Sequence, residues 1–99
     1  MNEITNDQKL MSYEGDITIY TAETIKQDLF TAISRKKNIN IELSDVSEFD
    51  TAGFQALVFG KKYANENGIE LRLCDASEAV SEVFQLYGMS DLLESHNES

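Results

Sequence analysis

A threonine at the expected start of a helix is the side chain best placed for chemistry in this sequence. Thr51 lies in the segment Asp50-Thr51-Ala52-Gly53. Asp50 is a suitable N-cap, since its carboxylate can accept hydrogen bonds from amides in the first helical turn. Thr51 would then be the first helical residue, with its hydroxyl exposed. Such a hydroxyl can contact a partner molecule, although threonine is also common at helix starts for purely structural reasons.

Few other side chains could do chemistry. Cys74 is the one cysteine, so there is no disulfide framework and no cysteine-based zinc site, and we expect it to be a small apolar filler. His96 lies in a polar tail that lacks the rigid geometry of a metal site. Asp45, Asp50 and Asp75 could meet where parallel strands end, as a Mg²⁺ site or, as we expect, as solvated loop acids.

An enzyme or a nucleotide-binding domain is the least favoured class. The sequence contains no glycine-rich phosphate loop and no nucleophile paired with a base. We therefore predict a protein that is not an enzyme, with no catalytic residue, no metal site and no cofactor.

Composition and charge limit the classes of partner. The 99 residues include 8 Lys and Arg against 18 Asp and Glu, a formal charge of −10. This balance argues against nucleic acid and against an anionic membrane surface, and it favours a protein partner with a cationic patch. No apolar run reaches the roughly 18 residues of a membrane span, and no signal-peptide pattern is present. We expect a cytoplasmic protein that does not insert into the membrane.

The first third of the chain predicts a hairpin followed by a helix. Leu10–Tyr13 and Ile17–Tyr20 flank the turn-like tripeptide Glu14-Gly15-Asp16, which is typical of a β-hairpin. Apolar residues then recur at helical spacing after Thr21, a suitable N-cap. The basic residues 35–37 complete this helix, where cations complement its dipole.

The middle of the chain predicts two strands on either side of a helix. Residues 38–43 and 69–74 each alternate apolar and polar side chains, the pattern of a strand with one buried face. After the first strand we expect a loop over residues 44–50, and then a helix over residues 51–67 that Gly68 ends.

The remaining residues predict a third helix and a short closing one. The third helix begins after Ser77, ends at Gly88, and carries an apolar stripe formed by Val80, Val83, Phe84 and Tyr87. Met89, Leu92 and Leu93 suggest the short closing helix. The predicted order is ββαβαβαα, an α/β two-layer sandwich in which a four-stranded mixed sheet has helices mainly on one face.

The second helix has two unlike sides. Gly53, Leu57, Gly60 and Ala64 form a lean stripe, and a glycine costs about 1 kcal/mol of helix propensity relative to alanine, so we expect the helix to approach a strand closely. The opposite side carries Gln55, Phe59 and Lys62. An exposed Phe59 beside an exposed hydroxyl suggests a docking surface, and incidental exposure is the alternative.

Two segments of the sequence resemble STAS domains, the anti-sigma-factor-antagonist family. Residues 41–53, from Ile41-Glu42-Leu43 to Asp50-Thr51-Ala52-Gly53, are similar to the family's switch segment of strand, bridge and Asp-Ser/Thr-x-Gly. Residues 77–93 resemble its C-terminal pattern of Val and Phe before Leu-x-Gly and a paired Leu. The resemblance implies a single STAS-like domain over residues 8–94, and we expect flexible ends at 1–7 and 95–99.

The resemblance implies a non-catalytic switch. In the family's antagonists, a kinase that is also the anti-sigma factor phosphorylates the Ser or Thr after the motif acid, and the modified antagonist then releases it. The phosphoacceptor falls on Thr51 and the motif acid on Asp50, with Thr here where most such antagonists have Ser. The partner-binding residues expected on this basis are Asp45, Glu48, Asp50, Thr51, Ala52, Gln55, Phe59 and Lys62.

The same motif supports a second interpretation. Asp-Thr-x-Gly also resembles STAS proteins of a lipid-transport ABC complex and of chemotaxis signalling. In those systems the protein would be a constitutive subunit or scaffold, and Thr51 would be an unmodified contact with a transporter or chemotaxis component.

Overall fold

Strands and helices alternate along the described part of the chain. The computed structural model describes residues 8–94, so the expected flexible ends and His96 lie outside it. Its elements are, in chain order, β1 (Gln8–Ile17), α1 (Ala22–Ser34), β2 (Asn38–Phe49), α2 (Thr51–Glu66), β3 (Leu71–Cys74), α3 (Glu78–Leu86) and the short 3₁₀ helix η2 (Ser90–Leu92).

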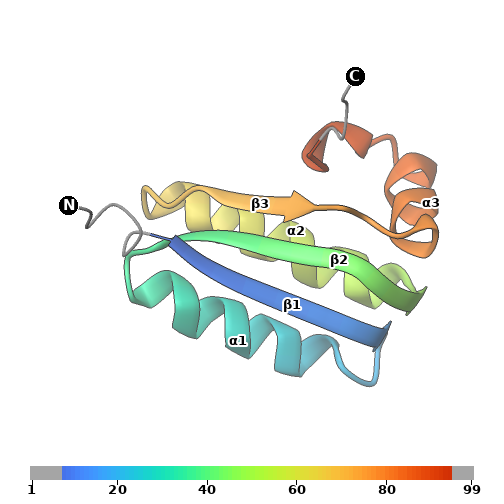
Figure 1. The fold of residues 1–99 in the computed structure, drawn as a ribbon, viewed down its shortest axis with the longest axis horizontal. Helices are drawn as coiled ribbons and strands as arrows, with labels where there is room; N and C mark the ends of the chain where they lie inside the picture. Colours follow the sequence, from blue (N-terminus) through green and yellow to red (C-terminus); the bar gives the residue numbers. More distant parts are fainter. Residues whose placement is uncertain (1–7, 95–99) are drawn as a thin grey trace.

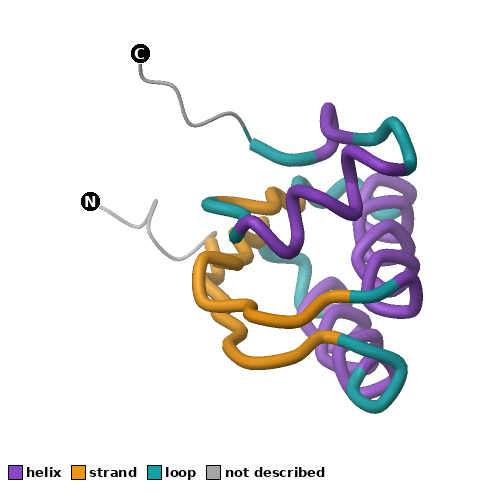
Figure 2. The backbone as a smooth tube through the Cα atoms, turned by 90° about the vertical axis from the view of Figure 1, so that its right-hand side faces the viewer, coloured by secondary structure: helices purple, strands orange, loops and turns teal. Residues whose placement is uncertain are grey.

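The three strands form one parallel sheet in the order β1-β2-β3. Both crossover helices, α1 and α2, lie on the same face of it, and α3 lies beside the end of β2 (Figure 1). In Figure 2 the strands are on the left and the two crossover helices on the right. The prediction of two layers with helices mainly on one face is therefore confirmed, because both crossovers step across the sheet in the same direction.

The predicted hairpin is wrong, and with it the four-stranded mixed sheet. β1 runs without a turn through residues 14–16, and its pairing with β2 shifts register there by β-bulges. Gly15 takes φ +79°, a conformation that serves a bulge as well as a turn. Residues 18–21 form a turn in which Thr21 N donates to Thr18 O (2.9 Å), so the second apolar stretch leads into α1.

The predicted loop over residues 44–50 is also wrong, because β2 continues as far as Phe49. Asp45 pairs with Glu14, and Phe49 pairs with Ile17, so the ladder with β1 extends almost to α2. The bulges break the strict alternation that marks a strand in the sequence: Val46 is buried, whereas residues 44, 45, 47 and 48 are exposed. Only Asp50 stands between strand and helix.

The core lies between the sheet and the helices. Its largest fully buried side chains include Ile17, Leu29, Ile41, Leu57 and Phe84. The lean stripe of α2 faces this core, and a Cβ at Gly53 would overlap the carbonyl oxygen of Ile17 at the end of β1. The expected close approach to a strand is thus confirmed at Gly53. Gly60 faces α1 instead, where a Cβ would lie 2.6 Å from Leu29 Cδ1.

The C-terminal third follows the prediction, with a shorter strand. Gly68 ends α2 with φ +73°, and Ser77 caps α3 by accepting a hydrogen bond from Val80 N (3.3 Å). The closing helix is the 3₁₀ turn η2. After it Leu93 forms a parallel bridge with Leu73, whose carbonyl accepts from Glu94 N (2.9 Å).

Within residues 8–94, we find no helix with the length and apolar character needed to cross a bilayer.

The packing of α2 predicts that its two buried glycines, Gly53 and Gly60, differ in how well they tolerate substitution by alanine. Gly53→Ala should lower the free energy of unfolding by about 2 kcal/mol, because the overlap with a backbone carbonyl outweighs a gain in helix propensity of about 1 kcal/mol. Gly60→Ala is the matched control and should change it by less than about 1 kcal/mol, since only the flexible end of Leu29 must move. Urea unfolding measures both, and equal losses would contradict this packing.

Candidate functional site

Asp50 joins the start of α2 to the connection between β1 and α1. Its backbone is extended, and its Oδ1 accepts from Gly53 N (3.0 Å), so the predicted N-cap is confirmed. Its Oδ2 accepts from Ile19 N (3.0 Å), 31 residues earlier in the chain. One carboxylate therefore satisfies two backbone donors and fixes two segments relative to each other.

Thr51 is exposed at the first position of α2, as the sequence predicts, but its hydroxyl has a partner. Thr51 Oγ1 and the Tyr87 hydroxyl lie 2.9 Å apart, within hydrogen-bond distance, and either can be the donor. The hydroxyl is thus held in one direction at the surface by a residue 36 positions away.

An aromatic cluster supports Tyr87. Its ring stacks on Phe54 with centroids 4.7 Å apart, and Phe54 meets the buried Phe84 edge to face at 4.9 Å. Phe84 in turn stacks with Phe49 at 6.0 Å. Tyr87 therefore has an apolar ring anchored on the core and a polar tip at the surface, where it meets Thr51.

The segments that contact Asp50 and Thr51 carry exposed apolar side chains. In the β1–α1 connection Ile19 is 69% exposed and Tyr20 is 90% exposed. At the end of α3, Leu86 is 77% exposed and precedes Tyr87. Exposed apolar groups beside an oriented hydroxyl are the composition of a protein-docking surface.

Half of the predicted partner-binding residues follow one stripe of α2. Thr51, Gln55, Phe59 and Lys62 are exposed and spaced by four, four and three residues, so they share one side of the helix, while Ala52 is half-buried. We call these four residues the outer stripe.

The aromatic part of the outer stripe is tied to α1. Phe59 stacks on Tyr63 with centroids 5.8 Å apart, and Tyr63 stacks on Phe30 at 5.2 Å. The Lys26 ammonium lies 5.2 Å from the Phe59 ring centroid, within cation–π range. Phe59, 38% exposed, is therefore one member of an aromatic row that bridges two helices.

Asp45 and Glu48 do not join the outer stripe. They flank Val46 and Phe49 in β2, and these two apolar residues pack on the core beneath the helices. Both acids are exposed in the bulged second half of β2 and do not lie on α2. There they pair with Glu14 and Asp16 of β1.

The expected gathering of Asp45, Asp50 and Asp75 is found only in part. A hydrogen bond with Asp75 raises the pKa of Glu42, and the charges of Asp75 and Asp45 raise it further. Asp50 instead binds backbone amides. Among residues 8–94 no group of three His, Cys, Asp or Glu side chains is arranged to hold a metal ion.

Cys74 is half-buried beside these acids. Burial raises the pKa of its thiol, and the nearby carboxylates of Glu94, Glu42 and Asp75 raise it further. A protonated thiol is a poor nucleophile, which supports its interpretation as a small apolar filler.

The residues predicted for this site do not include Tyr87, Ile19, Tyr20 or Leu86. The sequence predicts Tyr87 on the apolar stripe of α3, but it is 45% exposed and its hydroxyl lies against that of Thr51. The sequence predicts Ile19 and Tyr20 in a second hairpin strand, but they lie exposed in the connection that Asp50 holds. A tyrosine at a helix end was the available signal for the first, because its hydroxyl needs a polar partner.

Comparisons with known proteins give the family and the fold. A family model described as STAS domain matches residues 1–99. The anti-sigma-B factor antagonist of Bacillus subtilis (strain 168) is 28% identical over 80 residues, which make up 81% of this chain and 73% of that protein.

Solved structures share the architecture at lower identity. The anti-sigma factor antagonist SpoIIAA in its unphosphorylated form superposes with a TM-score of 0.78 at 19% identity, over 98% of this chain and 86% of that one. A sulfate transporter family protein from Wolinella succinogenes gives 0.73 at 18%, over 89% of this chain and 72% of that one. At such identities the likeness establishes the fold alone.

The double role of Asp50 predicts a graded response to substitution. Asp50→Ala should cost about 1–2 kcal/mol of stability and speed amide hydrogen exchange at both Gly53 and Ile19, because both lose their acceptor. Asp50→Asn retains one carbonyl oxygen and should protect only one of the two amides. Exchange rates measured by NMR that stay unchanged at both amides would contradict the geometry.

The pair of carboxylates formed by Glu42 in β2 and Asp75, just after β3, predicts a pH-dependent effect. Because the pKa of Glu42 is raised in the folded protein, its stabilising contribution is present at acid pH and is lost as the pH rises through that pKa. Glu42→Gln should therefore raise the urea midpoint at pH 7 and have little effect near pH 3. Glu82→Gln removes the same charge from α3 and is the control; equal shifts in both variants would rule out a specific pair.

Proposed function

Since this chain belongs to the STAS domain family, we propose that it is a non-catalytic protein-binding switch of the anti-sigma-factor-antagonist type, acting in the cytoplasm. Its phosphoacceptor is Thr51, and its partner is a serine/threonine kinase of the anti-sigma type. The observation that carries the proposal is the exposed Thr51 hydroxyl, oriented by Tyr87 at the first residue of α2.

Phosphorylation of Thr51 should alter the surface more than the fold. A phosphate adds about −1.5 to −2 charges at neutral pH. The first-turn amides of α2 stabilise that charge by about 0.3–1 kcal/mol, whereas the adjacent Asp50 carboxylate repels it. These local effects oppose each other, so the core packing is retained.

Phosphorylation fixes the direction of the hydrogen bond between Thr51 and Tyr87. The phosphoester replaces the hydroxyl proton of Thr51, so in the modified protein only Tyr87 can donate the hydrogen bond. Because the Tyr87 ring is stacked on Phe54, the tyrosine keeps its place and its hydroxyl remains available to a phosphate oxygen.

The larger effect of a phosphate is at an interface. Burying it against a partner without full pairing costs several kcal/mol, and about 3 kcal/mol weakens a complex roughly a hundredfold. The exposed apolar groups Ile19, Tyr20 and Leu86, together with the outer stripe, would supply contact area for the unmodified protein. A phosphate at Thr51 would lie among these contacts and release the partner.

The alternative is a constitutive subunit or scaffold, as in a lipid-transport ABC complex or a chemotaxis-type system. The same hydrogen bond favours it, since the Thr51 hydroxyl already has a partner and could act as a fixed, unmodified contact. The similarity in fold to a sulfate transporter family protein is consistent with such a role.

Thr51 variants separate the two roles. Partner proteins captured from the native cell and supplied with ATP should add one phosphate to the chain, detected by intact mass, and Thr51→Ala should abolish it while the exposed Thr31→Ala does not. Thr51→Ser should remain an acceptor. Thr51→Glu should bind the captured partner about a hundredfold more weakly than Thr51→Ala.

Two results would reject the switch. A stable complex in which no phosphate is ever found, and in which Thr51→Glu binds like Thr51→Ala, would favour the constitutive subunit. A phosphate that persists in Thr51→Ala would move the acceptor to another residue.

A further inference from the structure

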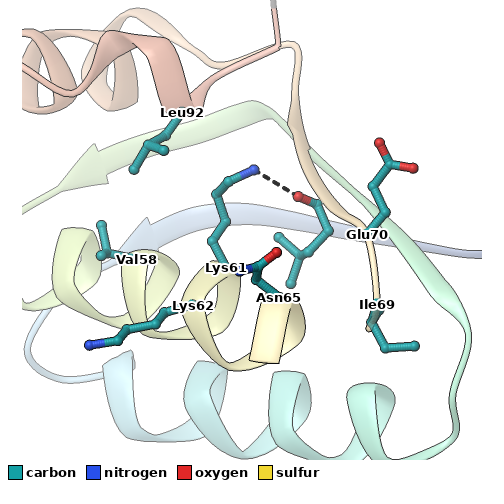
Figure 3. A pocket seen from close by; sticks show the side chains of 8 residues that line it. Val58, Lys61, Lys62, Asn65, Ile69, Glu70 and Leu92 are labelled. Atoms are coloured by element: carbon teal, nitrogen blue, oxygen red, sulfur yellow. Dashed lines mark hydrogen bonds between the residues drawn. The ribbon is translucent and has the colours of Figure 1, made fainter. Parts of the chain in front are cut away.

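A pocket of about 400 Å³ lies on the flank of α2 that faces β3 and η2 (Figure 3). Its apolar wall is formed by Val58, Ile69, Leu71 and Leu92, and its polar side by Lys61, Lys62, Asn65 and Glu70. The volume falls within the range of small-molecule sites, and a mostly apolar lining with a few polar groups is their usual composition. Neither the Thr51 site nor the outer stripe uses this apolar wall.

Lys61 places a positive charge in the wall of the pocket. Its Nζ is directed across the pocket and donates to Leu71 O (2.9 Å), as the dashed line in Figure 3 shows. An ammonium has three donors, and within residues 8–94 this hydrogen bond is the one that Lys61 makes. No carboxylate in that part of the chain forms an ion pair with it.

The carboxylate at the rim of the pocket, Glu70, already forms an ion pair with another residue. Glu70 pairs with Arg72 at 3.0 Å on the sheet side, so its charge does not neutralise Lys61. Asn65 lies beside Lys61 in Figure 3 and adds an amide that can donate. In a chain of net charge −10, this pocket thus combines a cationic group with an apolar wall.

We propose that this pocket binds a small amphipathic anion, with an apolar body and a single carboxylate or phosphate head. The head would bind Lys61 and Asn65 by charge-assisted hydrogen bonds, and the body would lie on Val58, Leu71 and Leu92. Charge complementarity selects an anion over a neutral or cationic ligand of the same shape.

The proposal does not depend on the switch at Thr51. Val58, Lys61 and Asn65 lie on a different flank of α2 from Thr51, and Lys62 is the one outer-stripe residue that also lines the pocket. The pocket instead adjoins the segment after η2, because its lining residue Leu92 is followed by Leu93, which forms the bridge with Leu73. A bound ligand would therefore slow hydrogen exchange at Glu94 N, which donates to Leu73 O.

Titration of the ¹⁵N-labelled chain with octanoate and with octyl phosphate tests the proposal and distinguishes the two heads. At least one should give saturable NMR shifts at residues 58–71 and 92 and slower exchange at Glu94. Octan-1-ol should bind at least fivefold more weakly, and octylamine should give no saturable shift. Equal binding of octanol, shifts that do not saturate, or shifts at Tyr87 instead would overturn it.

Variants test the role of the ammonium. Lys61→Met keeps the aliphatic stem and should weaken binding of the anion at least fivefold, while Lys37→Met, the same charge change at an exposed position outside the pocket, should not. Leu92→Ala reduces the apolar wall and should weaken binding even if Lys61→Met fails to fold. Unchanged affinity in the folded variants would overturn the proposal. NMR shifts at the pocket residues that depend on protein concentration in the absence of ligand would also overturn it, because they would assign the pocket to a second copy of the chain.

Discussion

The position of Thr51 depends on a carboxylate that bridges distant parts of the chain. Asp50 accepts from Gly53 N in α2 and from Ile19 N in the β1–α1 connection. The missing side chain at Gly53 allows α2 to begin directly against the Ile17 carbonyl at the end of β1. Helix start, strand end and connection are therefore one unit. Under the proposed switch, a phosphate at Thr51 would change the charge of this unit without a change of fold.

Features that arise from neighbouring residues could be predicted from the sequence. The N-cap at Asp50, the glycine that ends α2 and the start of α3 at Ser77 each follow from local hydrogen bonding or backbone freedom. The long-range pairing of β1 with β2 does not. A glycine with positive φ suits a turn and a bulge equally, so the sequence around Gly15 is compatible with a hairpin. In the second half of β2 the bulges interrupt the alternation of apolar and polar residues, so that this part of the sequence resembles a loop.

In the candidate site, too, local features could be predicted from the sequence and long-range contacts could not. Thr51 and its exposed position could be predicted from the residues around it, but its partner Tyr87 comes from the end of another helix. Helical spacing placed Tyr87 on an apolar stripe, which describes its ring correctly and omits its hydroxyl. The separation of Asp45 and Glu48 from the outer stripe likewise requires β2 to be known, because both acids belong to its bulged second half and not to a loop before α2.

The two edges of the sheet are unlike in what they offer to another chain. At the outer edge of β3, the carbonyl of Leu71 is taken by Lys61 and that of Leu73 by Glu94 N. Among residues 8–94, β1 pairs with β2 alone, so its ten residues have an outer edge without a strand. Strand addition from another chain is therefore hindered at the β3 edge and sterically open at the β1 edge of the described residues.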